Sequence, residues 1–213
     1  MNLPFTEEQF LNNFANYNSD VFPAQIFLYL LAVLAIYLVF HKKAYSDRLI
    51  SGILAFLWLW MGIVYYILYF SSINKPAYIF GFLFIVQAAL FLKYGVLDRK
   101  LSFRFGTDIY GFAGLAMILY GLVLYPIFGY LIGHVYPYQP IFGVPCPTTI
   151  FTFGLLLWTS SKLPKPILAI PLLWSFVGFT AAFVFGILED ILLLVSGLVA
   201  VILIWYRDRI KKA

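Results

Sequence analysis

The sequence predicts an all-α integral membrane protein, on the strength of its composition and of the length of its apolar runs. Hydrophobic residues make up 63% of the 213 residues and charged residues only 11%, and the mean hydropathy is +0.94. A soluble domain has about 45–50% apolar and about 25% charged residues. Because a chain of this size leaves much of its surface exposed, we expect its principal partner to be the lipid bilayer.

The apolar residues fall into runs that predict seven transmembrane helices. A helix needs about 20 predominantly apolar residues to cross a bilayer. Runs of this kind occupy residues 22–40, 49–71, 77–97, 109–132, 147–160, 166–187 and 189–206. We therefore expect a seven-helix transmembrane domain over residues 22–213, preceded by an outer-face amphipathic segment over residues 1–21.

The basic residues predict how the chain is threaded. Of the 14 Lys and Arg residues, only Lys75 falls in the N-terminal segment or in the loops after the second, fourth and sixth runs. Cytoplasmic loops are enriched in Lys and Arg, so we expect the plasma (inner) membrane, with the N-terminus outside and the C-terminus in the cytoplasm. The net charge of +5 resides in these short loops rather than on one soluble face, so we expect no nucleic-acid partner.

The N-terminal segment has the pattern of a short amphipathic helix. Thr6 and Gln9 have the spacing of a capping box. One face of the helix that follows would carry Phe10, Leu11, Phe14 and Tyr17. The pattern predicts a helix on the outer membrane surface, acting as an anchor or as a lid.

Two pairs of segments suggest an internal repeat. "FPAQIFLYLLAVL" at 22–34 is similar to "CPTTIFTFGLLLW" at 146–158, and "GILAFLWLW" at 52–60 is similar to "PILAIPLLW" at 166–174. The fourth run would then link two parallel three-helix halves, an arrangement in which transporters place a solute site near the midplane. In this layout alone, the chain resembles the SWEET sugar facilitators and the PQ-loop proteins.

The stretch "GHVYPYQPIFGVPCPTTIF" at 133–151 interrupts the apolar pattern. The run that follows it, 147–160, covers about 21 Å at 1.5 Å per residue, which is less than the membrane core of about 30 Å. Pro145 and Pro147 prevent the helix from starting earlier. We expect the preceding residues to dip inward as irregular chain, which is tolerated only inside protein or along a wet cavity.

Polar residues near this stretch are the candidate solute-binding residues. Thr148 and Thr149 would present free N–H groups at the positive end of a helix. Glu189 and Asp190 begin a short final run and are drawn toward the outer membrane boundary, where a carboxylate usually faces a cavity or a partner. His134 falls at about the same level. The other candidates are Gln25, Gln87, Trp60, Trp174, Tyr136 and Cys146.

Each candidate also has a purely structural interpretation. The two carboxylates can cap the first turn of the last helix, and the histidine and tyrosine can bond loop carbonyls at the membrane interface. The glutamines and the second threonine can form hydrogen bonds between helices. The cysteine and the tryptophans can serve as packing residues.

Several function classes find no support in the residues. One thiol with one nearby imidazole makes a poor site for a soft metal, and the last apolar run has no central lysine to hold retinal. No H-E-x-x-H, G-x-S-x-G or P-loop motif is present. We expect no metal and no cofactor. An intramembrane enzyme, which would depend on the carboxylates, His134 or Cys146, is a weaker hypothesis than a transporter.

Three segments resemble a known family. They are "WLWMGIVYY" at 58–66, "INKPAYIFGFLFIVQ" at 73–87 and "HVYPYQPIFGVPCPTTIFTFGLL" at 134–156. They are similar to an uncharacterised family of small bacterial membrane proteins with a domain of unknown function, over nearly the whole chain. The resemblance implies a multi-pass membrane protein and no particular activity.

The sequence therefore favours a small-solute transporter or facilitator with an outward-facing polar vestibule. The alternative is a membrane sensor or partner subunit that transports nothing. The two hypotheses differ in whether the polar residues border a path for a solute or only hold helices together.

Overall fold

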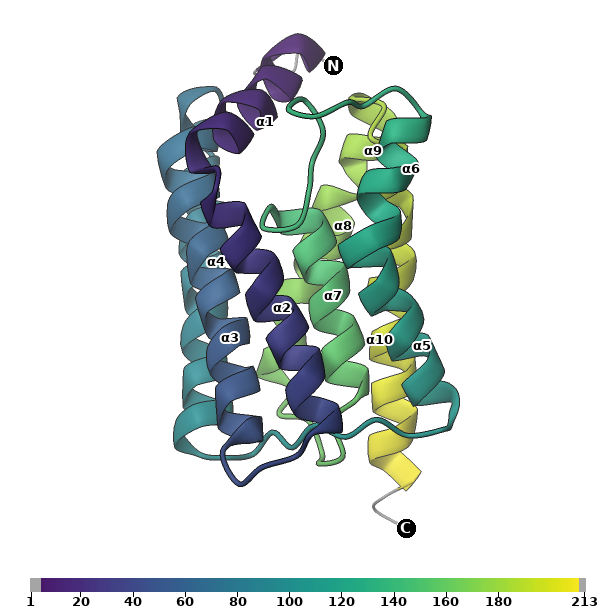
Figure 1. Ribbon diagram of the computed structural model, residues 1–213. Coiled ribbons are helices and arrows are strands. Elements are labelled where there is room, and N and C mark those ends of the chain that lie inside the picture. Colours follow the sequence, from purple (N-terminus) through teal and green to yellow (C-terminus); the bar gives the residue numbers. More distant parts are fainter. Residues whose placement is uncertain (1–4, 211–213) are drawn as a thin grey trace.

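The chain forms an upright bundle of helices (Figure 1). The computed structural model describes residues 5–210, and no β-strand forms among them. The elements in chain order are α1 (Glu7–Val21), α2 (Ala24–Phe40), α3 (Ser46–Trp60), η1 (Met61–Tyr69), η2 (Phe70–Ser72), α4 (Ala77–Phe91), η3 (Leu92–Leu97), α5 (Ile109–Leu119), η4 (Tyr120–Leu124), α6 (Tyr125–Leu131), α7 (Pro145–Leu157), α8 (Pro166–Gly178), α9 (Thr180–Val184), η5 (Leu188–Asp190) and α10 (Ile191–Ile210).

Several of these helices fit a multi-pass membrane protein. Within the described residues, five helical segments are long and apolar enough to cross a bilayer, namely Ser46–Ser72, Ala77–Leu97, Ile109–Leu131, Pro166–Val184 and Leu188–Ile210. A sixth results if α1 and α2, which meet at 85°, are taken as one broken span. The apolar helix α7 has only 13 residues. The bundle also exposes large apolar side chains that suit lipid, such as Phe82, Ile79 and Phe183.

The short helix α7 lies at the centre of the bundle. It packs against α5, η4, α8 and α10, and all its residues from Pro147 to Leu157 are buried. Gly154 of α7 crosses Gly114 of α5 so closely that a Cβ added to either glycine would lie 2.7 Å from the carbonyl oxygen of the other. Small residues at such crossings allow two helix backbones to approach. The neighbouring helices therefore enclose α7.

The segment between α6 and α7 descends into the bundle, as the prolines predict (Figure 1). Residues 139–144 are non-helical and buried, and α7 begins at Pro145. Gly143 adopts a φ of 103°, a conformation that glycine reaches without steric cost. The Tyr17 hydroxyl donates to the Gly143 carbonyl at 3.2 Å, and the Asn18 amide donates to the Gln139 carbonyl at 2.9 Å. Side chains of α1 thus satisfy buried backbone groups of this segment.

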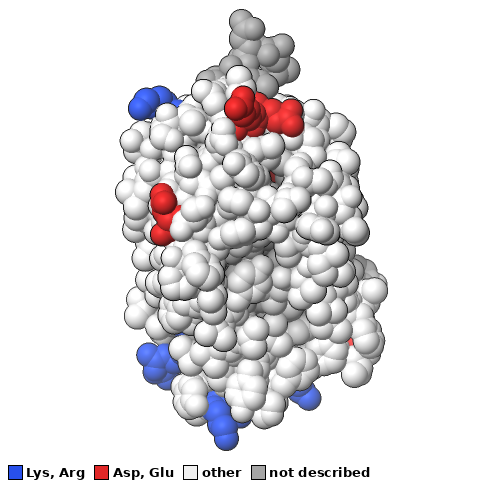
Figure 2. Space-filling model, turned by 45° about the horizontal axis from the view of Figure 1, so that its top comes forward, with Lys and Arg blue, Asp and Glu red and all other residues white. Residues whose placement is uncertain are grey.

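The loops rich in Lys and Arg meet at one end of the bundle. Lys42, after α2, donates to the Phe103 carbonyl at 2.8 Å. Ser160, after α7, donates its backbone N–H to Ser102 at 2.7 Å. Figure 2 shows basic side chains of the visible face mainly at the lower end and acidic ones toward the end that carries α1. This arrangement agrees with the alternation of charge along the sequence.

The two proposed halves pack differently. In the first half, the middle helix α3 contacts both α2 and α4. In the second half, the last helix α10 is the one that packs most extensively against both α7 and α8. The internal repeat and the count of seven crossings therefore stay predictions.

We expect that replacing a glycine by alanine at the close crossing of α5 and α7 destabilises the protein. Gly154→Ala forces a Cβ against the Gly114 carbonyl and should lower the free energy of unfolding by about 1–3 kcal/mol, the usual effect of overpacking. The matched control is Gly52→Ala, because a Cβ at Gly52 meets nothing within 4 Å. Thermal unfolding of the purified protein in detergent measures both variants. Equal melting temperatures for the two would contradict this view of the crossing.

Candidate functional site

A cavity lies in the half of the bundle that carries α1. It has a volume of about 140 Å³ and lies between the phenylalanines of the N-terminal segment, the end of η1, the α8–α9 region and the start of α7. An engineered protein cavity of about 150 Å³ holds one benzene molecule. The cavity therefore has room for a small organic molecule.

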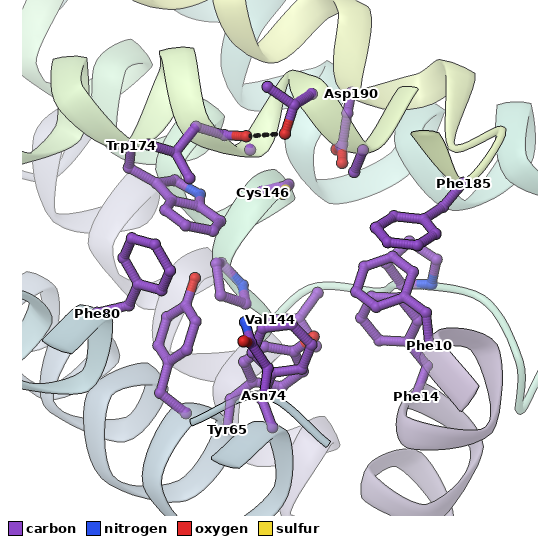
Figure 3. A pocket seen from close by; sticks show the side chains of 18 of the residues that line it. Phe10, Phe14, Tyr65, Asn74, Phe80, Val144, Cys146, Trp174, Phe185 and Asp190 are labelled. Atoms are coloured by element: carbon purple, nitrogen blue, oxygen red, sulfur yellow. Dashed lines mark hydrogen bonds between the residues drawn. The ribbon is translucent and has the colours of Figure 1, made fainter. Parts of the chain in front are cut away.

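Aromatic side chains form a large part of its wall (Figure 3). Phe10 of α1 lies with its ring centroid 4.5 Å from that of Phe185, which follows α9. Across the cavity, Trp174 of α8 lies 5.6 Å from Phe80 of α4. The remaining aromatic lining residues are Phe5, Phe14, Tyr65, Tyr66 and Phe70. Aromatic rings of this kind supply large apolar contact with directional electrostatics.

A few polar atoms interrupt the aromatic wall. Asp190 and Cys146 both line the cavity, and the Asp190 side chain is only 2% exposed. Three further lining atoms are buried without a hydrogen-bond partner among the described residues, namely Tyr66 Oη, Asn74 Oδ1 and Trp174 Nε1. A buried polar group without a partner costs about 1–3 kcal/mol. These atoms are therefore available to a bound molecule.

Two adjacent carboxylates lie at the start of α10. Glu189 is fully buried, and its Oε1 lies 2.9 Å from His134 Nδ1, whereas its Oε2 has no partner among the described residues. The Tyr125 hydroxyl donates to Asp190 Oδ1 at 2.5 Å. The Tyr120 hydroxyl donates to the Glu189 backbone carbonyl at 3.0 Å. The start of a helix favours negative charge, but two buried carboxylates still require compensating protons or cations.

Local structure brings these groups to the site. Gly186, with a φ of 68°, turns the chain after α9 into the short η5 helix that holds both carboxylates. Tyr65 and Tyr66 stand on η1, and Tyr120 opens η4. Both elements are π-helical. Wide turns of this type are frequent at functional sites, although η3, which is also π-helical, lies away from the cavity.

The structure brings together five of the candidate residues. Cys146, Trp174 and Asp190 line the cavity. Glu189 follows directly in the same η5 turn, and His134 is bonded to Glu189. These residues come from separate helices and loops, and their grouping supports the expectation that polar groups gather in one half of the bundle.

The other candidates lie away from the cavity, and all of them except Thr149 have hydrogen-bond partners in the structure. Thr148 Oγ1 accepts the Gly143 N–H at 3.0 Å, and Thr149 is fully buried with no partner for its hydroxyl among the described residues. Two candidates bond α1, since Gln25 donates to Asn18 at 2.7 Å and Trp60 donates to Tyr17 at 2.7 Å. The last two donate to backbone carbonyls. The Tyr136 hydroxyl donates to the Asn18 carbonyl at 3.2 Å, and the Gln87 amide donates to the Ile167 carbonyl at 3.0 Å.

Sequence reasoning proposed Trp174 as a lining residue but missed the phenylalanines and tyrosines of the wall. The face of α1 that we expected on the membrane surface turns inward instead, because Phe10 and Phe14 pack against Tyr65, Phe70 and other rings of the bundle. The capping box at the start of α1 is confirmed. An amphipathic pattern alone does not distinguish a lipid surface from a protein surface, so no signal in the sequence identified the inward orientation.

Comparison with known proteins gives one match. Residues 7–213 match the model of a family described as a family of unknown function (DUF6064). No curated protein and no solved structure matches the chain. Within residues 5–210, no group of three or more His, Cys, Asp and Glu side chains is placed to hold a metal ion.

The bond from Tyr125 to Asp190 should contribute measurably to stability. Tyr125→Phe removes the O–H donor and leaves a fully buried carboxylate oxygen without it, so the free energy of unfolding should fall by about 1–3 kcal/mol. Tyr130→Phe is the matched control, because Tyr130 is 63% exposed. Thermal unfolding in detergent compares the two variants, and an equal shift in both would show that the bond has no stabilising role.

Proposed function

Because the chain belongs to this family of unknown function, we propose from its own residues that it binds a small organic solute in the aromatic cavity and transports it across the membrane. The observation that carries the proposal is an aromatic cavity bordered by a buried carboxylate, within a bundle that has five to six apolar candidate spans. Ligand sites are typically apolar concavities with a few polar groups that orient the ligand.

The proposal includes a threading of seven crossings with the N-terminus outside. In it, α2 crosses alone and α7, at about 20 Å, completes its crossing through the buried irregular chain at 139–144. Such a short helix is tolerable because protein rather than lipid surrounds it. The Lys- and Arg-rich end is then cytoplasmic, and the cavity belongs to the outer half.

The helix α1 is the part of the wall best suited to admit a solute. It meets α2 at 85° and contributes Phe10 and Phe14 to the cavity. Tyr17 and Asn18 bond it to the irregular chain before α7. A small rotation of α1 about its junction with α2 would open the cavity outward without moving the central helices.

One observation favours the alternative, a sensor that binds a solute without moving it. From Ile150 to Leu157, α7 is buried throughout, and Trp58 packs beside it with a hydrogen bond to Thr152 at 3.1 Å. A transporter must open this inner half during its cycle, whereas a sensor need not. Flux and binding therefore have to be measured separately.

Reaction of Cys146 with a membrane-impermeant maleimide in intact cells tests access to the cavity. Cys146 is the only cysteine, so all labelling reports on it, and Cys146→Ser gives the background. We expect slow labelling from outside, and labelling at least three times faster in Phe10→Ala, which thins the α1 wall.

Two variants in the Cys146→Ser background serve as position controls. Ser72→Cys, on an exposed residue near the α1 end, should label in intact cells. Lys43→Cys, exposed at the basic end, should label only after the membrane is permeabilised. Labelling of Ser72→Cys with none of Cys146, in the wild-type chain and in Phe10→Ala, would refute an outward-opening cavity. Solute binding without flux in proteoliposomes would select the sensor.

A further inference from the structure

The charged group that borders the cavity is a carboxylate. Among the described residues that line it, Asp190 is the one carboxylic acid and none is Lys, Arg or His. Its neighbour Glu189 adds a second buried carboxylate, and His134 contacts Glu189 rather than the cavity. A protonated His134 balances one negative charge at most. The second charge calls for a proton or for a cation beside Asp190.

The rest of the wall suits an organic cation. The faces of aromatic rings are electron-rich and attract an ammonium group, and cages of such rings recognise methylated ammonium ions. Phe10 and Phe185 stand on one side of the cavity, and Phe80 and Trp174 stand on the other (Figure 3). A hydrated metal ion gains little from such rings, whereas an alkylated ammonium gains contact with both the rings and the carboxylate.

The volume of the cavity and its unpartnered polar atoms restrict the size and the functional groups of the ligand. A volume of about 140 Å³ accommodates a molecule of about six to eight non-hydrogen atoms, by comparison with the benzene-binding cavity. Tyr66 Oη, Trp174 Nε1 and Asn74 Oδ1 are buried without partners among the described residues. They can accept or donate a hydrogen bond to a single hydroxyl or carbonyl group on the ligand.

We propose that this cavity binds a small alkylated ammonium ion, with the Asp190 carboxylate as its counter-ion and the surrounding rings as its cage. The inference rests on the proposed function and specifies its solute class. A neutral molecule of the same shape fills the same space but leaves the buried negative charge without a cation.

The test compares two probes of equal shape by isothermal titration calorimetry. Choline carries a quaternary nitrogen, and 3,3-dimethylbutan-1-ol places a neutral carbon at the same position. The full chain is purified in a maltoside detergent, which contains no ammonium group. We expect choline to bind at least ten times more tightly than the neutral alcohol. The substitution Asp190→Asn should weaken choline binding at least tenfold.

Matched variants separate local effects from loss of fold. Asp20→Asn makes the same change on an exposed acid and should leave choline binding unaltered. Phe10→Leu keeps an apolar side chain but removes an aromatic ring, so choline affinity should fall about fivefold. Phe22→Leu changes a 58% exposed ring outside the cavity and should have no effect. Each variant is used only if its unfolding transition remains cooperative.

The outcomes distinguish this proposal from the one on which it rests. Equal affinity for the two probes, or full choline affinity in Asp190→Asn, overturns the ammonium assignment. No binding of choline, with Cys146 still reactive from outside, overturns the assignment and leaves a cavity for a different solute. No binding together with an unreactive Cys146, in a folded protein, overturns both proposals.

Discussion

The enclosure of α7 by its neighbours is the constraint on which the rest of the structure depends. A helix of 13 residues spans about 20 Å, which is less than the thickness of a membrane core. The backbone groups beyond its ends therefore need hydrogen-bond partners that lipid does not supply. Its neighbours solve this by surrounding it, and the glycine crossing with α5 shows how closely they approach. The space above its start is then filled by irregular chain and by α1, which leaves the aromatic cavity between them.

The polar chemistry of the site follows from the same enclosure. Groups at the start of α10 lie in protein rather than in headgroups, so Glu189 and Asp190 are buried and depend on His134 and Tyr125 for hydrogen bonds. In water these contacts would contribute little, whereas in a low-dielectric interior they are strong. The site therefore places two buried carboxyl groups close to an aromatic wall.

The sequence predicted the elements of this fold better than their arrangement. Hydropathy predicted the segment 77–97 with the same limits as the observed Ala77–Leu97, because a long apolar run has one stable conformation in lipid. Pro145 and Pro147 predicted the late start of α7 to within two residues, because the effect of a proline on the backbone is local. The sequence predicted only that His134 and Glu189 lie at about the same depth in the membrane. It did not predict the contact between them, since distances between helices depend on packing. The inward face of α1 was missed, because its phenylalanines suit lipid and protein equally.

The shortness of α7 also bears on how the protein is made. During synthesis, a membrane insertase recognises segments by their length and apolarity, and 13 residues preceded by prolines form a weak signal. Five other segments of this chain carry the full signal. The ribosome delivers α5 and η4 before α7, and α8 and α10 after it, so α7 can become enclosed only after α10 has emerged. Until then, α7 lacks part of the protein surface that surrounds it in the finished bundle.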